Sequence, residues 1–150
     1  PCRNLTGHGL GKFKVHTAPH IPNYKDASRH KIQPGMTFAI EPFATNGRGL
    51  VYNGEGATLF SVADDVKNYD GFLKEVYTTA LSFHGLPFCM HDLITPTTPV
   101  EIVKKAVAIL IKDGAFDDFA PLIEEAGGMV AQAEDSIMVD EKGRVFFTTC

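Results

Sequence analysis

Two histidines near the start of the chain have the side-chain type and spacing that catalysis could use. His8 and His16 lie eight residues apart, and glycines at positions 7, 9 and 11 surround the first of them. Glycine permits backbone conformations that other residues avoid and lets the main chain approach a ligand closely. Residues 12–16 alternate between polar and apolar side chains, as in a half-buried strand. We therefore expect His8 in a tight glycine turn and His16 at the far end of a short strand, both directed at one pocket.

Two carboxylates further along the chain could complete a metal site with His8. Glu41 lies in the β-type run 36–43, and Pro42 directly after it keeps Glu41 out of the helical region and ends strand pairing on that side. Glu134 stands at the entry to a later strand. One imidazole and two carboxylates are a typical ligand set for a hydrolytic divalent metal ion. Each glutamate alone is also explained as a solvated carboxylate at a strand end, so the spacing leaves both interpretations open.

The middle of the chain predicts a helical block placed between strands. Short strands are expected at residues 50–52 and 59–62. The period of three and four in the apolar residues of 71–83 predicts an amphipathic helix. In a second helix, which ends at Gly114, Thr98 is the expected cap, Pro99 the first helical residue and Glu101 the partner in a capping box. A third, shorter helix is expected over residues 118–125.

The remaining connections are predicted from turn residues. Prolines and a Pro-Gly turn indicate a loop over residues 17–35, where His20 and His30 are expected to be ordinary exposed histidines. Strands at 136–139 and 144–148 flank a loop of hairpin length that ends in glycine.

Composition restricts the class of protein. The 150 residues carry a net charge of −4, which argues against a nucleic-acid-binding protein, and no apolar run reaches the length of a membrane span. The helical block is also acidic, which disfavours DNA binding. The three cysteines, Cys2, Cys89 and Cys150, form no CxxC pair, so we interpret them as reduced thiols of an intracellular protein.

Three motifs in order resemble the C-terminal half of a type II methionine aminopeptidase of archaeal character. They are NLTGHGLG at residues 4–11 followed by His16, FAIEPF at 38–43, and VAQAEDSI at 130–137. The match covers essentially the whole chain. The helical insertion before the last glutamate, and Thr17 after His16 where type I enzymes and prolidase relatives usually have glutamate, both favour type II.

The resemblance implies an α+β fold of the pita-bread class, seen as a half-domain with an inserted helical subdomain. Residues 1–64 and 126–150 would form the C-terminal half of the catalytic domain, and residues 65–125 would form the insertion. The N-terminal half, which carries two aspartate ligands and a further histidine of the family, would be a required partner.

The resemblance also implies roles for individual residues. His8 and Glu41 would be terminal ligands of one metal ion, and Glu134 would bridge two divalent ions, which could be Co, Mn, Fe, Zn or Ni. His16 would contact the substrate near the scissile amide, and Glu41 would be the candidate base for the water nucleophile. Val15, Phe119 and residues 59–63 would line the methionine pocket. The implied activity is removal of the first methionine from nascent polypeptides in the cytoplasm, with no nucleic-acid or membrane partner.

Two departures from the family pattern flank the last glutamate. The family usually has an aromatic residue before it and histidine after it, where this chain has Ala133 and Asp135. An additional carboxylate beside a metal ligand changes the local charge. A non-catalytic pita-bread module that binds peptides or proteins is therefore one alternative, although the three expected ligands argue against it. A prolidase-like peptidase, which would share these ligands, is another.

Overall fold

The chain divides into two compact units. The computed structural model describes residues 1–63 and 67–149. One unit contains Pro1–Asn53 and Leu122–Cys150, and the other contains Gly54–Pro121. The division differs from the expected boundaries after residues 64 and 125, because the strand at 59–62 pairs inside the second unit and the strand at 122–124 pairs inside the first. The assignment of residues 1–64 and 126–150 to half of a catalytic domain stays a prediction in those bounds.

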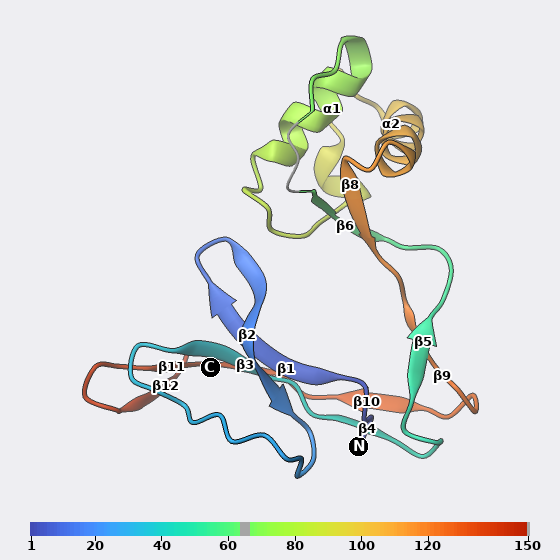
Figure 1. Ribbon diagram of the computed structural model, residues 1–150. Helices are drawn as coiled ribbons and strands as arrows, with labels where there is room; N and C mark the ends of the chain where they lie inside the picture. The colour runs from blue at the N-terminus through green and yellow to red at the C-terminus, as the bar shows by residue number, and fades with distance from the viewer. Residues whose placement is uncertain (64–66, 150) are drawn as a thin grey trace. The chain divides into compact units, whose positions relative to one another are not determined.

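The first unit is built on a five-stranded antiparallel sheet with the strand order β12-β11-β3-β1-β2 (Figure 1). Its strands are β1 (Thr6–Gly11), β2 (Lys14–Pro22), β3 (Thr37–Ile40), β11 (Asp135–Val139) and β12 (Val145–Phe147). Alternation along β3 and β11 directs Phe38, Ile137 and Val139 into a small core, with Ile21 and Met36 packed against it. The sheet thus joins the beginning and the end of the chain through its central strand, β3.

Two short ribbons extend the first unit. β4 (Phe43–Thr45) pairs with β10 (Val130–Gln132), and β5 (Val51–Asn53) pairs with β9 (Leu122–Glu124). The buried carboxylate of Glu124 accepts hydrogen bonds from the backbone N–H groups of Gly49 at 3.1 Å, Ala126 at 2.7 Å and Gly128 at 2.9 Å. These bonds lower the pKa of Glu124, with the bond from Gly128 contributing most. One side chain therefore fixes the loops at the ends of both ribbons.

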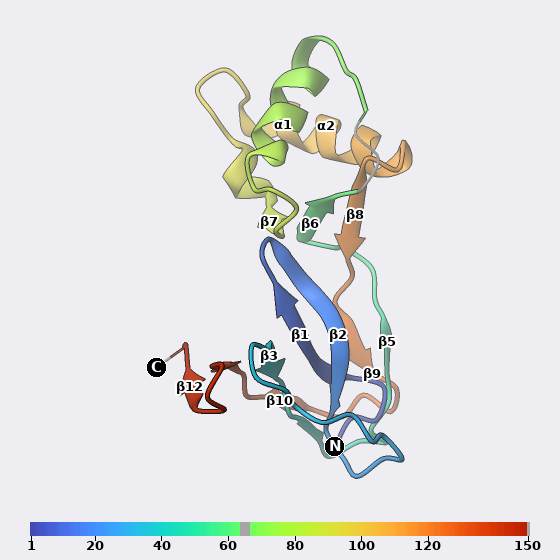
Figure 2. The ribbon, with the colours of Figure 1, turned by 60° about the vertical axis from the view of Figure 1, so that its left-hand side comes forward.

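The second unit packs helices against a three-stranded sheet. β6 (Leu59–Val62) pairs with β7 (Phe88–Cys89) and with β8 (Phe116–Phe119). Figure 2 shows α1 (Gly71–Leu81) and α2 (Val100–Lys112) beside this sheet, and the short helix η1 (Met90–Leu93) follows β7. The fully or nearly fully buried side chains of these elements form one core: Phe60, Val76, Tyr77, Ala80, Phe88, Leu93, Val103, Ala106, Val107, Leu110, Ala115 and Phe116.

The two longer helices agree with the sequence periodicity, but the helix expected at 118–125 is wrong. That segment contributes residues to β8 and β9 instead. Local propensity gives way there to tertiary pairing, because β6 and β5 supply antiparallel partners for the two strands. The predicted cap of α2 is also wrong. Pro99 is the N-cap residue, while the Thr98 hydroxyl donates 3.1 Å to the carbonyl of Leu93, so the expected capping box is not made.

The first hairpin differs from its prediction as well. The turn lies at Lys12 and Phe13, between β1 and β2, where a strand was expected. β2 continues to Pro22, so His20 lies on a strand and not in a loop. The other predicted strands are confirmed by β5, β6 and the β11–β12 hairpin.

The remaining expectations concern cysteines and membrane spans. Cys2 and Cys89 are free thiols, and Cys150 lies outside the described residues. Within residues 1–63 and 67–149 there is no helix with the length and apolar character needed to span a membrane.

Candidate active site

His8 is held in the middle of β1, between two strands, and not in a glycine turn. It pairs with His20 of β2 on one side and with Ala39 of β3 on the other. A Cβ atom on Gly7 would lie 2.3 Å from the carbonyl oxygen of Ala39, and one on Gly9 would lie 2.1 Å from that of Ala18. Glycine is therefore needed on both sides of His8 for close strand packing, not for a turn.

Glu41 meets His8 from the neighbouring strand. It follows β3 directly, and its Oε1 lies 2.8 Å from Nε2 of His8, with side chains that are 14% and 9% exposed, respectively. The other ring nitrogen, Nδ1, lies 3.1 Å from the carbonyl oxygen of Gly9. In the tautomer that donates from Nδ1 to this carbonyl, Nε2 is the nitrogen available to a ligand, as is usual for metal-binding histidines.

His16 places a second imidazole against the first. The ring centroids of His8 and His16 are 4.2 Å apart, with an angle of 63° between the ring planes. Burial lowers the pKa of His16, and the positive charge of protonated His8 lowers it further. The neutral form of His16 is thus favoured near neutral pH, where it can donate one hydrogen bond and accept another.

The pKa of Glu41 is shifted in the opposite direction to that of His16. Burial is the largest cause and raises the pKa of Glu41; the charge of His8 opposes this rise, and the charge of Glu134 adds to it. A carboxylate with a raised pKa is a stronger base than an exposed glutamate. Two titratable groups that are shifted in this way in one cavity are typical of a functional site.

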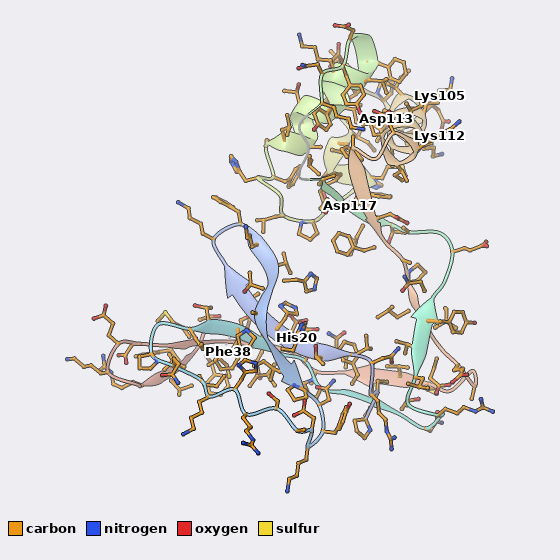
Figure 3. All side chains as sticks on the ribbon, in the orientation of Figure 1. His20, Phe38, Lys105, Lys112, Asp113 and Asp117 are labelled. Atoms are coloured by element: carbon orange, nitrogen blue, oxygen red, sulfur yellow. The ribbon has the colours of Figure 1, made fainter. Side chains whose placement is uncertain are left out.

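These side chains line a cavity of about 540 Å³ in the first unit. His8, His16 and Glu41 share its wall with His20, for which only the role of an ordinary exposed histidine was expected. Figure 3 shows His20 on β2. The signal that could have identified it is the alternation of β2, since residues 16 and 20 lie on the same face of a strand. Leu5, Phe43 and Leu122 supply apolar wall.

The other expected site residues are not among the residues that line this cavity. Glu134 is exposed just before β11, and its Oε2 accepts a hydrogen bond of 3.3 Å from the side chain of Gln132. Val15 is half-buried on β2 but does not line the cavity. Phe119 belongs to β8 of the second unit. The structure thus brings together His8, His16 and Glu41.

The donor atoms of His8 and Glu41 fit a divalent cation in type. An imidazole nitrogen and a carboxylate oxygen are common ligands of Zn, Mn, Co and Fe, and here they converge within 2.8 Å. Within the described residues, however, no three His, Cys, Asp or Glu side chains are grouped so that they could hold a metal ion. A complete coordination shell therefore needs further donors.

The sequence pattern of metallopeptidase family M24 matches residues 1–141, and the chain belongs to this family.

Its relatives include methionine aminopeptidases, as the motifs predicted. The chain is 33% identical to the enzyme of Saccharolobus solfataricus over 93% of this chain and 47% of that protein. It is 34% identical to the enzyme of Thermococcus kodakarensis over 99% and 50% of the two chains. It is also 32% identical to methionine aminopeptidase 2 of Saccharomyces cerevisiae, over 93% and 34%. The chain spans about half the length of its archaeal relatives.

The fold prediction is confirmed. A solved structure of a thermophilic Arx1 matches with a TM-score of 0.74 at 16% identity, over 93% of this chain and 38% of that chain. With the family assignment, this likeness shows the pita-bread fold. Among its described residues, the second unit contains the strands β6, β7 and β8 in addition to the predicted helices α1 and α2.

Proposed function

We propose that this chain supplies the C-terminal half of a methionine aminopeptidase site that hydrolyses the first peptide bond of proteins beginning with methionine. The observation that carries the proposal is the convergence of His8, His16 and Glu41 on one cavity in a chain of family M24. The similarity to methionine aminopeptidases from archaea and yeast supports this substrate.

In the proposed site His8, Glu41 and Glu134 are three of five ligands for two divalent metal ions. The rise that Glu134 causes in the pKa of Glu41 supports its placement near this pair. Two aspartates on an N-terminal half would complete the set. Bound divalent ions would supply Lewis-acid polarisation of the amide carbonyl and an acidified water.

The side chains of this chain orient the substrate and move protons. His16 donates a hydrogen bond from its neutral ring to the scissile amide, and its contact with His8 fixes its position beside the metal ligands. Glu41 accepts a proton from the attacking water, a role that its raised pKa favours. The substrates are the N-termini of nascent chains, and the site acts in the cytoplasm.

Hydrolysis of a methionyl tripeptide by this chain, with and without an N-terminal half, tests the proposal. We expect the chain alone to be inactive, because two aspartates are needed to bind the ions, and activity to appear when both halves are present with Mn²⁺. Substantial activity of the chain alone would contradict the five-ligand site. Preference for a Xaa-Pro peptide over Met-Ala would indicate a prolidase-like enzyme instead.

A further inference from the structure

His20 lies on the same face of the β1–β2 hairpin as the two site histidines. Side chains at alternate positions of a strand point to the same side, which places His16, Ala18 and His20 together. His20 is the register partner of His8 across the strand pair, and paired residues also share a face. The strand register and the cavity lining therefore lead to the same conclusion, because all three histidines line one cavity.

A bulge in β2 brings His20 opposite His8. The register passes from Gly9 paired with Thr17 to His8 paired with His20, so Ala18 and Pro19 have no counterparts on β1. Because side chains alternate between the faces of a strand with a period of two, an insertion of two residues leaves His20 on the same face as His16. Bulges next to active sites commonly direct a side chain in this way.

His20 also stands where the site cavity meets a second one. Ala18 and His20 line both the 540 Å³ cavity and a neighbouring cavity of about 410 Å³. The second cavity is further lined by Asp26, Ser28 and His30. Pro19 and Met36 complete the wall of this second cavity.

The His20 imidazole is available to a ligand. It is exposed, and within the described part of the chain no side chain or backbone group forms a hydrogen bond or ion pair with it. A histidine side chain in this position can donate a hydrogen bond to a bound peptide.

We propose that His20 is a substrate-binding residue that donates a hydrogen bond to a main-chain carbonyl of the peptide beyond its first residue. This inference rests on the proposed function. His8 and Glu41 mark the place of the scissile bond, so the peptide continues from there along the cavity. The second cavity, which shares Ala18 and His20 with the first, gives the peptide chain room to continue past His20. The contact discriminates longer peptides from substrates that lack a second residue.

Kinetics of the protein with both halves and Mn²⁺ test the assignment on two substrates, Met-Ala-Ser and methionine p-nitroanilide. His20→Ala is expected to lower kcat/KM for the tripeptide about 3- to 10-fold, the effect of one lost hydrogen bond. The anilide has no carbonyl beyond the scissile bond, so its kcat/KM is expected to stay unchanged. His20→Gln, which keeps a donor, is expected to restore most of the loss.

His91→Gln is the matched control, because His91 is exposed on η1 of the second unit and should affect neither substrate. An equal loss on both substrates for His20→Ala would show a role in the chemistry or in packing, and no loss on either would show no role; both results overturn the inference. Hydrolysis of neither substrate by the unsubstituted protein would instead overturn the proposed function, and the inference with it.

Discussion

The two units of this chain differ in what their side chains are used for. In the second unit, residues from two helices and three strands bury one continuous apolar core that includes Phe60, Val76, Leu110 and Phe116. In the first unit the largest apolar cluster consists of Phe38, Ile137 and Val139 with two partly buried neighbours. There, the inner strand β1 carries His8 between glycines instead of a large apolar residue. Burial stabilises the second unit, whereas the first presents polar groups in a cavity.

Among the cavity residues of the first unit, substitution of Glu41 is expected to have the largest effect on activity. In the protein with both halves, Glu41→Gln removes the charge and the proposed base while it keeps the shape of the side chain. We expect kcat to fall about 10²- to 10⁴-fold, the usual contribution of a general base. Methionine release from a tripeptide measures this. Glu101→Gln on the exposed face of α2 is the control and should leave kcat unchanged. An active Glu41→Gln enzyme would remove Glu41 from the chemistry.

The largest effect on stability is expected in the core of the second unit. Phe116 is 2% exposed, and its ring packs against Phe88 and Tyr77 at centroid distances of 5.2 and 6.1 Å. Phe116→Ala should lower the free energy of unfolding by about 3–5 kcal/mol. Denaturant titration followed by circular dichroism measures the loss. Ile109→Ala, at a position that is 43% exposed on α2, should cost well under half as much. Similar losses for the two variants would contradict the assignment of this core.

In the first unit, a single carboxylate should make stability depend on pH. Hydrogen bonds from backbone N–H groups lower the pKa of Glu124 below its ordinary value of 4.5. The folded state therefore binds this proton more weakly than the unfolded state. The resulting stabilisation is present above pH 4.5 and is lost as the pH falls through the folded pKa.

The free energy of unfolding by urea, measured at several pH values between 6 and 3 for the unsubstituted protein and for Glu124→Gln, tests this contribution. The unsubstituted protein should be the more stable one at pH 6, and the difference should narrow towards pH 3. Glu125→Gln is a matched control, because Glu125 is exposed and its carboxylate lies 3.5 Å from the guanidinium of Arg48. A difference between the Glu124 variant and the parent that does not change with pH would show that the carboxylate acts through its shape alone.

The smallest effect is expected on the surface of α2. Lys104 Nζ lies 3.2 Å from Oε1 of Glu101, and both side chains are more than half exposed. Lys104→Ala should change the free energy of unfolding by only about 0.2–0.5 kcal/mol, since water and salt screen such pairs. Thermal unfolding at low and high salt measures this, with Lys105→Ala as the comparison, because Lys105 forms no ion pair with any other residue of 1–63 and 67–149. A large loss for Lys104→Ala would mean that the surface of the second unit stabilises it as much as its core.

Sequence periodicity predicted the elements whose burial follows a local pattern. α1 and α2 repeat their apolar residues every three or four positions, and the β11–β12 hairpin has a glycine-ended loop between alternating strands. The helix prediction for residues 118–125 was wrong because the structure of this segment depends on pairing with strands distant in sequence, β6 and β5. The prediction that Thr98 caps α2 was wrong because its hydroxyl donates a hydrogen bond to the carbonyl of Leu93. A turn at residues 95–98 brings these two groups together.

Part of the candidate site was also accessible from the sequence. The motifs around His8 and Glu41 predicted two groups in one site, and the structure places their donor atoms 2.8 Å apart. The local environment of His8 was not predicted, because glycines that allow a turn equally allow a close strand contact. His20 was missed because the prolines of residues 17–35 suggested a loop, and the two-residue bulge that directs His20 to the cavity depends on pairing with β1.

Metal binding tests the central claim that His8 and Glu41 form part of a dinuclear metallopeptidase site. Calorimetric titration of Mn²⁺ into the protein with both halves should show saturable binding at two sites per molecule. In His8→Ala of the same protein, at least one of these sites should be lost, while a His30→Ala control should bind as the parent does. Two unchanged sites in the His8 variant, or no saturable binding in the parent, would contradict the account.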